Sequence, residues 1–182
     1  MSLRLFTALT IPGDIAEDLS RFMRGVDGAA WRPVENLHVT LAFYGELMEP
    51  DAKDLDSAIE EATASIGPFP IALKGAGSFG KDEPSALWMG VEESPALREL
   101  SAACVRAARR IGAPVEARKY TPHVTMAYLR GTTLDQAERF VARHGLYHSR
   151  SWRVDRFGLF SSTLRKIGPS LYLEEAAYPL LG

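Results

Sequence analysis

The chain has 182 residues, 46% of them hydrophobic, and a formal net charge of −2. This composition supports one domain with a sizeable core and excludes a disordered or low-complexity protein. The single cysteine, Cys104, excludes an internal disulfide. No apolar stretch is long enough to cross a bilayer, so we expect no membrane segment and a cytoplasmic location.

Charge is unevenly distributed along the chain. Residues 105–166 contain 13 Lys and Arg against 4 Asp and Glu, whereas residues 1–104 contain 8 against 17. A basic segment in a weakly acidic protein is typical either of a locally held phosphate ligand or of a solvated basic face. It does not indicate a protein that coats long nucleic acid, because such a domain would be strongly basic throughout.

Hydrophobic periodicity predicts a mixture of strands and helices in chain order. The predicted strands cover residues 2–10, 37–44, 69–79, 85–91, 120–128, 152–161 and 171–178. The predicted helices begin near Pro12, Glu49, Ser94 and Thr133 and end near Val26, Gly67, Ile111 and His144. We therefore predict an α+β fold, a single domain over residues 1–182 with two similar lobes around a cleft.

One seven-residue pattern occurs twice, at residues 37–43 and again at 122–128. The shared core is His-Val-Thr, a long apolar residue, Ala, and then an aromatic residue. Each copy lies in a predicted strand, 37–44 or 120–128. Regular alternation puts the histidine, threonine and alanine of each copy on one face. It puts the aromatic residue on the opposite face.

The two copies supply two imidazoles, His38 and His123, and two hydroxyls, Thr40 and Thr125. Near pH 7, one imidazole can be neutral while the other is cationic. The neutral ring can take a proton from water while the cation protonates a leaving oxygen. The threonine hydroxyls can donate to phosphate oxygens as charge develops there. This set suits the cleavage of a phosphate ester, and the residues alone do not say which histidine is the acid.

Other catalytic chemistries have less support. Neither His38 nor His123 has a second His, Cys or acidic residue at i+2 or i+4, so we expect no metal ion and no cofactor. The chain has no Gly-x-Ser-x-Gly elbow. Cys104 falls on the apolar stripe of a predicted helix, where a thiol packs as a small hydrophobic group. We expect His144 and His148 to be structural.

Aromatic residues divide into two groups. Phe43, Trp88 and Phe140 fall on apolar stripes and are expected in the core. Phe6 and Tyr128 are candidates on which a base could stack.

Segments along nearly the whole chain resemble the 2H phosphoesterase superfamily, above all its RNA 2′,3′-cyclic phosphodiesterases, also known as LigT-like 2′-5′ RNA ligases. The motif segments and their surroundings carry this resemblance: residues 4–8, 11–12, 35–45, 75–79, 87–90 and 120–127. The resemblance implies a bilobal fold in which two antiparallel sheets face each other across a central cleft, with helices outside. It also implies a pseudo-two-fold axis that relates duplicated lobes.

The resemblance further implies metal-independent hydrolysis of a terminal 2′,3′-cyclic phosphate to a 2′-phosphate. By this analogy His38 is the proton donor to the departing 3′ oxygen, and His123 is the proton acceptor that activates water. Thr40 and Thr125 would hold the phosphate.

The chain departs from the family pattern at two places. Many relatives carry arginine directly after the alanine of the second motif, where this chain has Tyr128, with Arg130 two residues later. Relatives often have a second aromatic residue after Phe6, where this chain has Thr7. We take Phe6, Tyr128 and Arg130 as candidate substrate contacts, although regular alternation points Arg130 away from the histidine face.

The leading hypothesis is a monomeric cyclic phosphodiesterase that acts on RNA ends or small cyclic nucleotides. One alternative is 2′-5′ RNA ligation by the same site, which is the reverse of cleavage through the cyclic phosphate. Another is a nucleotide sensor that binds without turnover.

Overall fold

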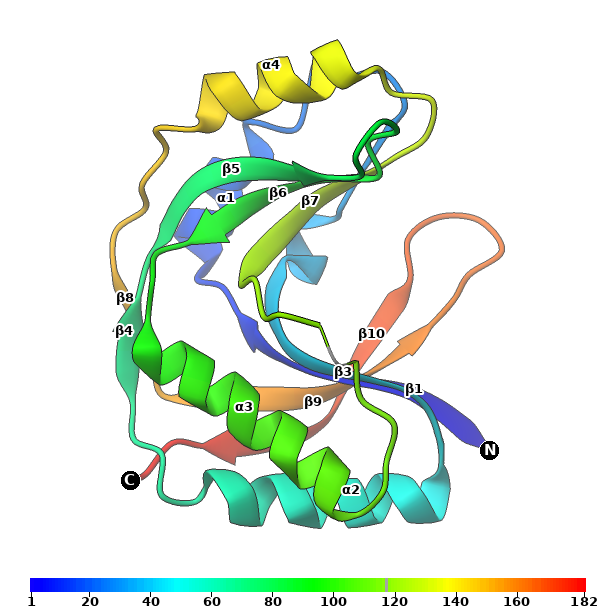
Figure 1. Ribbon diagram of the computed structural model, residues 1–182, viewed down its shortest axis with the longest axis vertical. Coiled ribbons are helices and arrows are strands. Elements are labelled where there is room, and N and C mark those ends of the chain that lie inside the picture. Colours follow the sequence, from blue (N-terminus) through cyan, green and yellow to red (C-terminus); the bar gives the residue numbers. More distant parts are fainter. Residues whose placement is uncertain (117) are drawn as a thin grey trace.

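The computed structural model describes residues 1–116 and 118–182 (Figure 1). The predicted α+β fold is confirmed, with four α-helices and mostly antiparallel strands in the described residues. The helices are α1 Gly13–Ser20, α2 Glu49–Thr63, α3 Pro95–Arg110 and α4 Leu134–His144, with a short 3₁₀ helix η1 at Val34–Asn36. The strands are β1 Ser2–Thr10, β2 Ala29–Trp31, β3 His38–Met48, β4 Phe69–Ile71, β5 Leu73–Phe79, β6 Ala86–Val91, β7 His123–Leu129, β8 Trp152–Val154, β9 Arg156–Thr163 and β10 Leu171–Pro179.

Eight strands form one strongly bent sheet in the order β10-β9-β1-β3-β7-β6-β5, and β2 pairs with β7 beside this path. The halves β10-β9-β1-β3 and β7-β6-β5 meet at a single residue pair, Val39 with Val124. The two antiparallel sheets expected from the sequence are therefore two halves of one sheet. Strands β4 and β8 form a separate two-stranded sheet.

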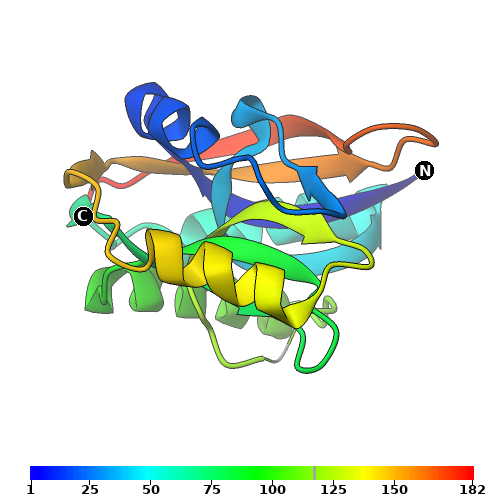
Figure 2. The same cartoon turned by 90° about the horizontal axis from the view of Figure 1, so that it is seen from above.

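The helices cover the outside of this sheet. Helices α2 and α3 pack side by side against the first half, through β3, whereas α4 packs against β5 of the second half (Figures 1 and 2). Ser94 caps α3 by accepting a hydrogen bond from the Leu97 backbone N–H, and Thr133 caps α4 in the same way. None of the described helices combines the length and apolar character needed to span a bilayer.

Helix α1 is shorter than predicted. It ends at Ser20, whereas the apolar spacing extends to Val26. Gly25 and Gly28 both have positive φ and turn the chain towards β2. A Cβ at Gly28 would lie 2.2 Å from the carbonyl oxygen of Arg130, so this close backbone approach requires glycine.

The first motif strand, β3, contains a β-bulge within the motif. Thr40 pairs with Ala8 of β1, but Thr7 pairs with Ala42, so Leu41 is an extra residue on β3. A bulge of this kind re-aims the side chains that follow it. Both Leu41 and Ala42 are buried in the core.

The second motif strand, β7, contains a bulge at the same position. Thr125 pairs with Trp88 of β6, but Leu87 pairs with Ala127, so Met126 is the extra residue. Met126 and Ala127 are both fully buried. The two copies of the motif therefore share their backbone irregularity as well as their residues.

The bulges reverse the faces that regular alternation predicts. Ala42 and Ala127 are buried on the face opposite the histidines, so the predicted alanine on the histidine face is wrong in both copies. The aromatic residues that follow, Phe43 and Tyr128, lie on the same face as the histidines. Phe43 was expected in the core, and this expectation is wrong for the same reason.

Candidate active site

The two motif histidines begin their strands and are oriented by equivalent contacts. His38 Nδ1 lies 2.7 Å from the carbonyl oxygen of Asn36, and His123 Nδ1 lies 2.6 Å from that of Thr121. A carbonyl oxygen only accepts, so each Nδ1 carries the hydrogen and donates. In the neutral ring, Nε2 is then the free base.

The motif threonines lie two residues after the histidines, on the same face. The Nε2 atom of His38 lies 3.1 Å from the hydroxyl oxygen of Thr40, which donates to it when the ring is neutral. Thr125 holds the equivalent place after His123 on β7, and both threonines are half-buried.

Burial makes both imidazoles weak bases in the unliganded protein. Burial lowers the pKa of His38 to about 4; the Asn36 carbonyl opposes this shift, and the charges of Arg32 and His123 add to it. Burial also lowers the pKa of His123, with a further contribution from Arg118. The charge of His123 contributes to the lowered pKa of His38, so the two rings lie close enough to interact electrostatically. His38 is therefore neutral at pH 7 in the unliganded protein.

Aromatic rings from β1 and β10 enclose His38. Its ring lies 5.1 Å from the ring of Phe6 and 5.4 Å, edge-on, from that of Tyr172. Phe6 and Tyr172 also contact each other edge-to-face at 5.2 Å. These contacts explain the burial that lowers the pKa of His38.

Aromatic rings from β5 and β6 enclose His123 in the same manner. Its ring lies 4.9 Å from that of Phe79 and 5.9 Å from that of Trp88. Trp88 was expected in the core, which is wrong, because it pairs with Thr125 on the histidine face. A Cβ at Gly77 would lie 2.2 Å from Cζ2 of Trp88, so the indole rests directly on this glycine.

Two arginines complete the site, and sequence reasoning missed them. The Arg32 guanidinium lies over the ring of Tyr128, 5.1 Å from its centroid, and the Arg4 guanidinium lies over Phe43, also at 5.1 Å. Each bulge therefore presents an aromatic face to a cation. Arg4 lies within the predicted strand 2–10 and Arg32 lies between predicted elements, and neither position carries a motif that would mark it as part of a site.

Side-chain donors from outside the motifs satisfy carbonyl groups around the β3 bulge. The Tyr120 hydroxyl donates to the Thr40 carbonyl at 2.9 Å, and the Ser101 hydroxyl donates to the Leu41 carbonyl at 2.6 Å. Tyr120 lies three residues before His123, so its bond ties the second motif to the first.

The remaining candidates are more distant from this arrangement. Arg130 lies just beyond the end of β7 with an exposed side chain, and its backbone N–H donates to the Gly28 carbonyl at 3.0 Å. Cys104 is fully buried in α3, where burial raises its thiol pKa to about 12. Within residues 1–116 and 118–182, no three His, Cys, Asp or Glu side chains are grouped as metal ligands.

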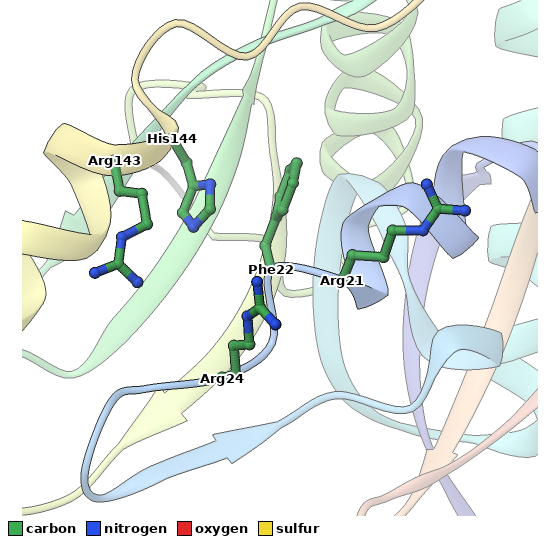
Figure 3. Close-up of a pocket in the computed structure, with 5 residues that line it drawn as sticks. All are labelled: Arg21, Phe22, Arg24, Arg143 and His144. Atoms are coloured by element: carbon green, nitrogen blue, oxygen red, sulfur yellow. The ribbon is translucent and has the colours of Figure 1, made fainter.

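A pocket of about 190 Å³ lies between the ends of α1 and α4 (Figure 3). Arg21, Phe22, Arg24, Arg143 and His144 line it. The His144 ring stacks on Phe22 with centroids 4.3 Å apart, which fits the structural role expected for this histidine. The pocket contains no motif residue and is distinct from the two-histidine site.

A duplicated two-histidine strand motif in a bent antiparallel sheet defines a class of phosphoesterases. The family described as the 2'-5' RNA ligase superfamily matches residues 11–165, and the chain belongs to this superfamily.

Its relatives include named enzymes. The chain is 30% identical over 97% of its length to an RNA 2',3'-cyclic phosphodiesterase of Geobacillus stearothermophilus, although it spans only 57% of that relative. It is 27% identical to one from Aquifex aeolicus, with 96% of each chain covered. It is 32% identical over 79% of its length to one from Aeropyrum pernix, of which it covers 84%.

Solved structures share the fold. The crystal structure of E. coli LigT complexed with 3'-AMP superposes with a TM-score of 0.81, at 23% identity and full coverage of both chains. The crystal structure of the protein TT0787 from Thermus thermophilus also gives a TM-score of 0.81, at 22% identity, with 98% of each chain covered.

Proposed function

We propose that this protein is an RNA 2′,3′-cyclic phosphodiesterase that hydrolyses a terminal 2′,3′-cyclic phosphate to a 2′-phosphate. The observation that carries the proposal is the matched pair of imidazoles, each with Nδ1 donating to a carbonyl, which leaves Nε2 as the basic nitrogen of the neutral ring. The names of the relatives support the choice of substrate.

In the proposed reaction, His123 Nε2 accepts a proton from water as the water oxygen attacks phosphorus. The bond between phosphorus and the 3′ oxygen breaks, and protonated His38 gives its Nε2 proton to that oxygen. The phosphate remains on the 2′ oxygen, and the two histidines exchange protons with solvent before the next turnover. The hydroxyls of Thr40 and Thr125 donate to the non-bridging phosphate oxygens.

We expect substrate binding to protonate His38, so that it can act as the general acid. The pKa of His38 is about 4 in the unliganded protein, so the ring is neutral at pH 7. A phosphate anion beside the imidazole favours its charged form and raises its pKa. The Thr40 hydroxyl, which donates to neutral Nε2 in the unliganded protein, is then free to donate to the phosphate.

The three candidate substrate contacts lie around the histidines at different distances. Phe6 packs on His38 and is itself buried, so it supports the imidazole, whereas Tyr128 presents a half-exposed ring on which a base could stack. Arg130 is a long-range contact for a substrate that extends past β7.

Both motifs lie in one chain, so a monomer is sufficient for catalysis, and we treat residues 1–182 as one domain of two intertwined lobes. Light scattering after size-exclusion chromatography tests whether the protein is a monomer.

A cytoplasmic location fits a chain whose single cysteine is a buried free thiol and whose proposed substrate is RNA.

Turnover of a 2′,3′-cyclic mononucleotide and a short cyclic-phosphate RNA in excess EDTA tests the proposal. We expect a 2′-phosphate product and a loss of about 10²- to 10⁴-fold in kcat for His38→Ala and for His123→Ala. His148→Ala is the matched control, since this exposed ring faces Glu92 at 3.6 Å, and it should retain full activity.

A 3′-phosphate product would contradict the assigned leaving group. Full activity in either histidine variant would contradict the acid-base pair. A wild-type protein that binds nucleotide without turnover would favour a sensor.

A further inference from the structure

Arg32 is placed at the site by contacts from three elements. It follows β2, its guanidinium lies over the Tyr128 ring of β7, and its Nη2 donates to the Tyr172 hydroxyl of β10 at 3.4 Å. Its side chain is half-buried. Stacking and partial burial hold the planar guanidinium in one orientation and limit its side-chain freedom.

The charge of Arg32 is not neutralised by a carboxylate of the described residues. In the part of the chain that the structure describes, no carboxylate lies within 4.0 Å of Arg32, whereas nine other basic side chains have one. A guanidinium has five N–H donors, and the described contacts engage only one. A half-buried, oriented and unpaired guanidinium suits a phosphate, which it can bind through two parallel hydrogen bonds.

Tyr172 separates this cation from the reacting centre. The Tyr172 ring meets His38 edge-on, while its hydroxyl accepts from Arg32. The hairpin that carries Tyr172 is fixed by the Asn36 side chain, which donates to the Ser170 carbonyl at 3.0 Å. The Tyr172 side chain thus lies between Arg32 and His38, while the charge of Arg32 still helps to lower the pKa of His38.

We propose that Arg32, held by Tyr128 and Tyr172, binds the phosphodiester that precedes the terminal nucleotide of an RNA strand. This inference rests on the proposed function, because it takes the cyclic phosphate to lie between the histidines. A nucleoside 2′,3′-cyclic phosphate with a free 5′ hydroxyl lacks this second anion. The subsite therefore selects RNA ends over mononucleotides.

The test varies the charge of the substrate linkage and the charge of the side chain at position 32. Substrates are a cyclic-phosphate mononucleotide, the dinucleotide that ends in the same nucleotide, and that dinucleotide with a neutral methylphosphonate linkage. Proteins are wild type, Arg32→Gln and Arg32→Lys, with Arg21→Gln as the control. Arg21 is exposed and lies 3.4 Å from Asp18, outside the two-histidine site.

We expect Arg32→Gln to lower the ratio of kcat/KM for the dinucleotide to that for the mononucleotide at least tenfold. In the wild-type protein, replacing the charged dinucleotide by its methylphosphonate analogue should lower kcat/KM to a similar degree. In Arg32→Gln the same replacement should have a much smaller effect. Arg32→Lys should be intermediate, because it keeps the charge and loses the planar fork. Arg21→Gln should keep the wild-type ratio. An unchanged ratio in Arg32→Gln would overturn the subsite.

Calorimetric binding separates this proposal from the proposed function. The 2′-phosphorylated dinucleotide and mononucleotide products serve as probes, so the measurement does not depend on turnover. Arg32→Gln should weaken dinucleotide binding tenfold more than mononucleotide binding. It should also lower the slope of log K against log salt concentration for the dinucleotide by ~0.7, the value for one phosphate contact on a single strand. Equal weakening of both probes would place Arg32 at the reacting phosphate and contradict the subsite.

Discussion

The Nε2 atom of His38 accepts a hydrogen bond from the Thr40 hydroxyl at 3.1 Å, within a single strand. The Asn36 carbonyl holds the opposite nitrogen at 2.7 Å, so both ring nitrogens are engaged and the neutral tautomer is defined. The hydroxyl stabilises the neutral ring in the unliganded protein, and we propose that it becomes a donor to phosphate when substrate binds.

Replacing Thr40 with valine tests this dual role. Thr40→Val keeps the β-branched shape and removes the donor, so we expect kcat to fall about 10²- to 10³-fold, as for loss of one oxyanion donor. The pKa of His38 should rise, because the neutral ring loses its hydrogen bond, and NMR titration of the imidazole measures this shift. Thr163→Val, at the exposed end of β9, is the control. A kcat within twofold of wild type would remove Thr40 from the proposed mechanism.

The pH dependence of kcat/KM should reflect the unliganded histidines. The acid must be protonated, and the pKa of His38 is about 4; the base must be neutral, and the pKa of His123 is also lowered. Hence kcat/KM should peak below pH 6.5, and above pH 6.5 it should fall about tenfold per pH unit. Bound phosphate raises the pKa of the acid, so the kcat optimum should lie at higher pH. Coincident optima for the two parameters would contradict substrate-coupled protonation.

Acid should destabilise the fold through His38. Its pKa is about 4 when folded and near the ordinary 6.5 when unfolded, so between these values the unfolded chain binds the extra proton. The stability of the folded state is complete above pH 6.5 and declines towards pH 4, by on the order of 3 kcal/mol from this group. Urea unfolding at pH 7 and pH 4 measures the change. His38→Gln should reduce it, and an equal decline in this variant would exclude His38 as its source.

Gly77→Ala should disturb His123 from a distance. The added Cβ would lie 2.2 Å from the Trp88 indole, which packs beside His123. We expect a loss of stability of about 1–3 kcal/mol from overpacking and a fall in kcat of up to about 10²-fold from misplacement of the imidazole. Urea midpoints and kcat check both. Gly13→Ala is the control, since its Cβ would meet nothing within 4 Å; identical behaviour of the two variants would contradict the packing role of Trp88.

The sequence predicted the motif strands well. Residues 37–44 and 120–128 correspond to β3 and β7, which begin at His38 and His123. The bulges could not be predicted, because Leu41-Ala42 and Met126-Ala127 are pairs of apolar residues that fit regular alternation equally well. The position of Arg32 could not be predicted either, since it depends on the pairing of the short strand β2 with β7.

Each bulge also separates two selective pressures within a single strand. The residues at 41, 42, 126 and 127 are buried and constrained by volume, whereas the next positions, 43 and 128, are more exposed and carry guanidinium groups over their rings. A substitution at either position can change what the site accepts at a lower cost in core packing than a substitution at the four buried positions. These two positions are therefore the places where descendants of this fold can acquire new ligand preferences through single substitutions.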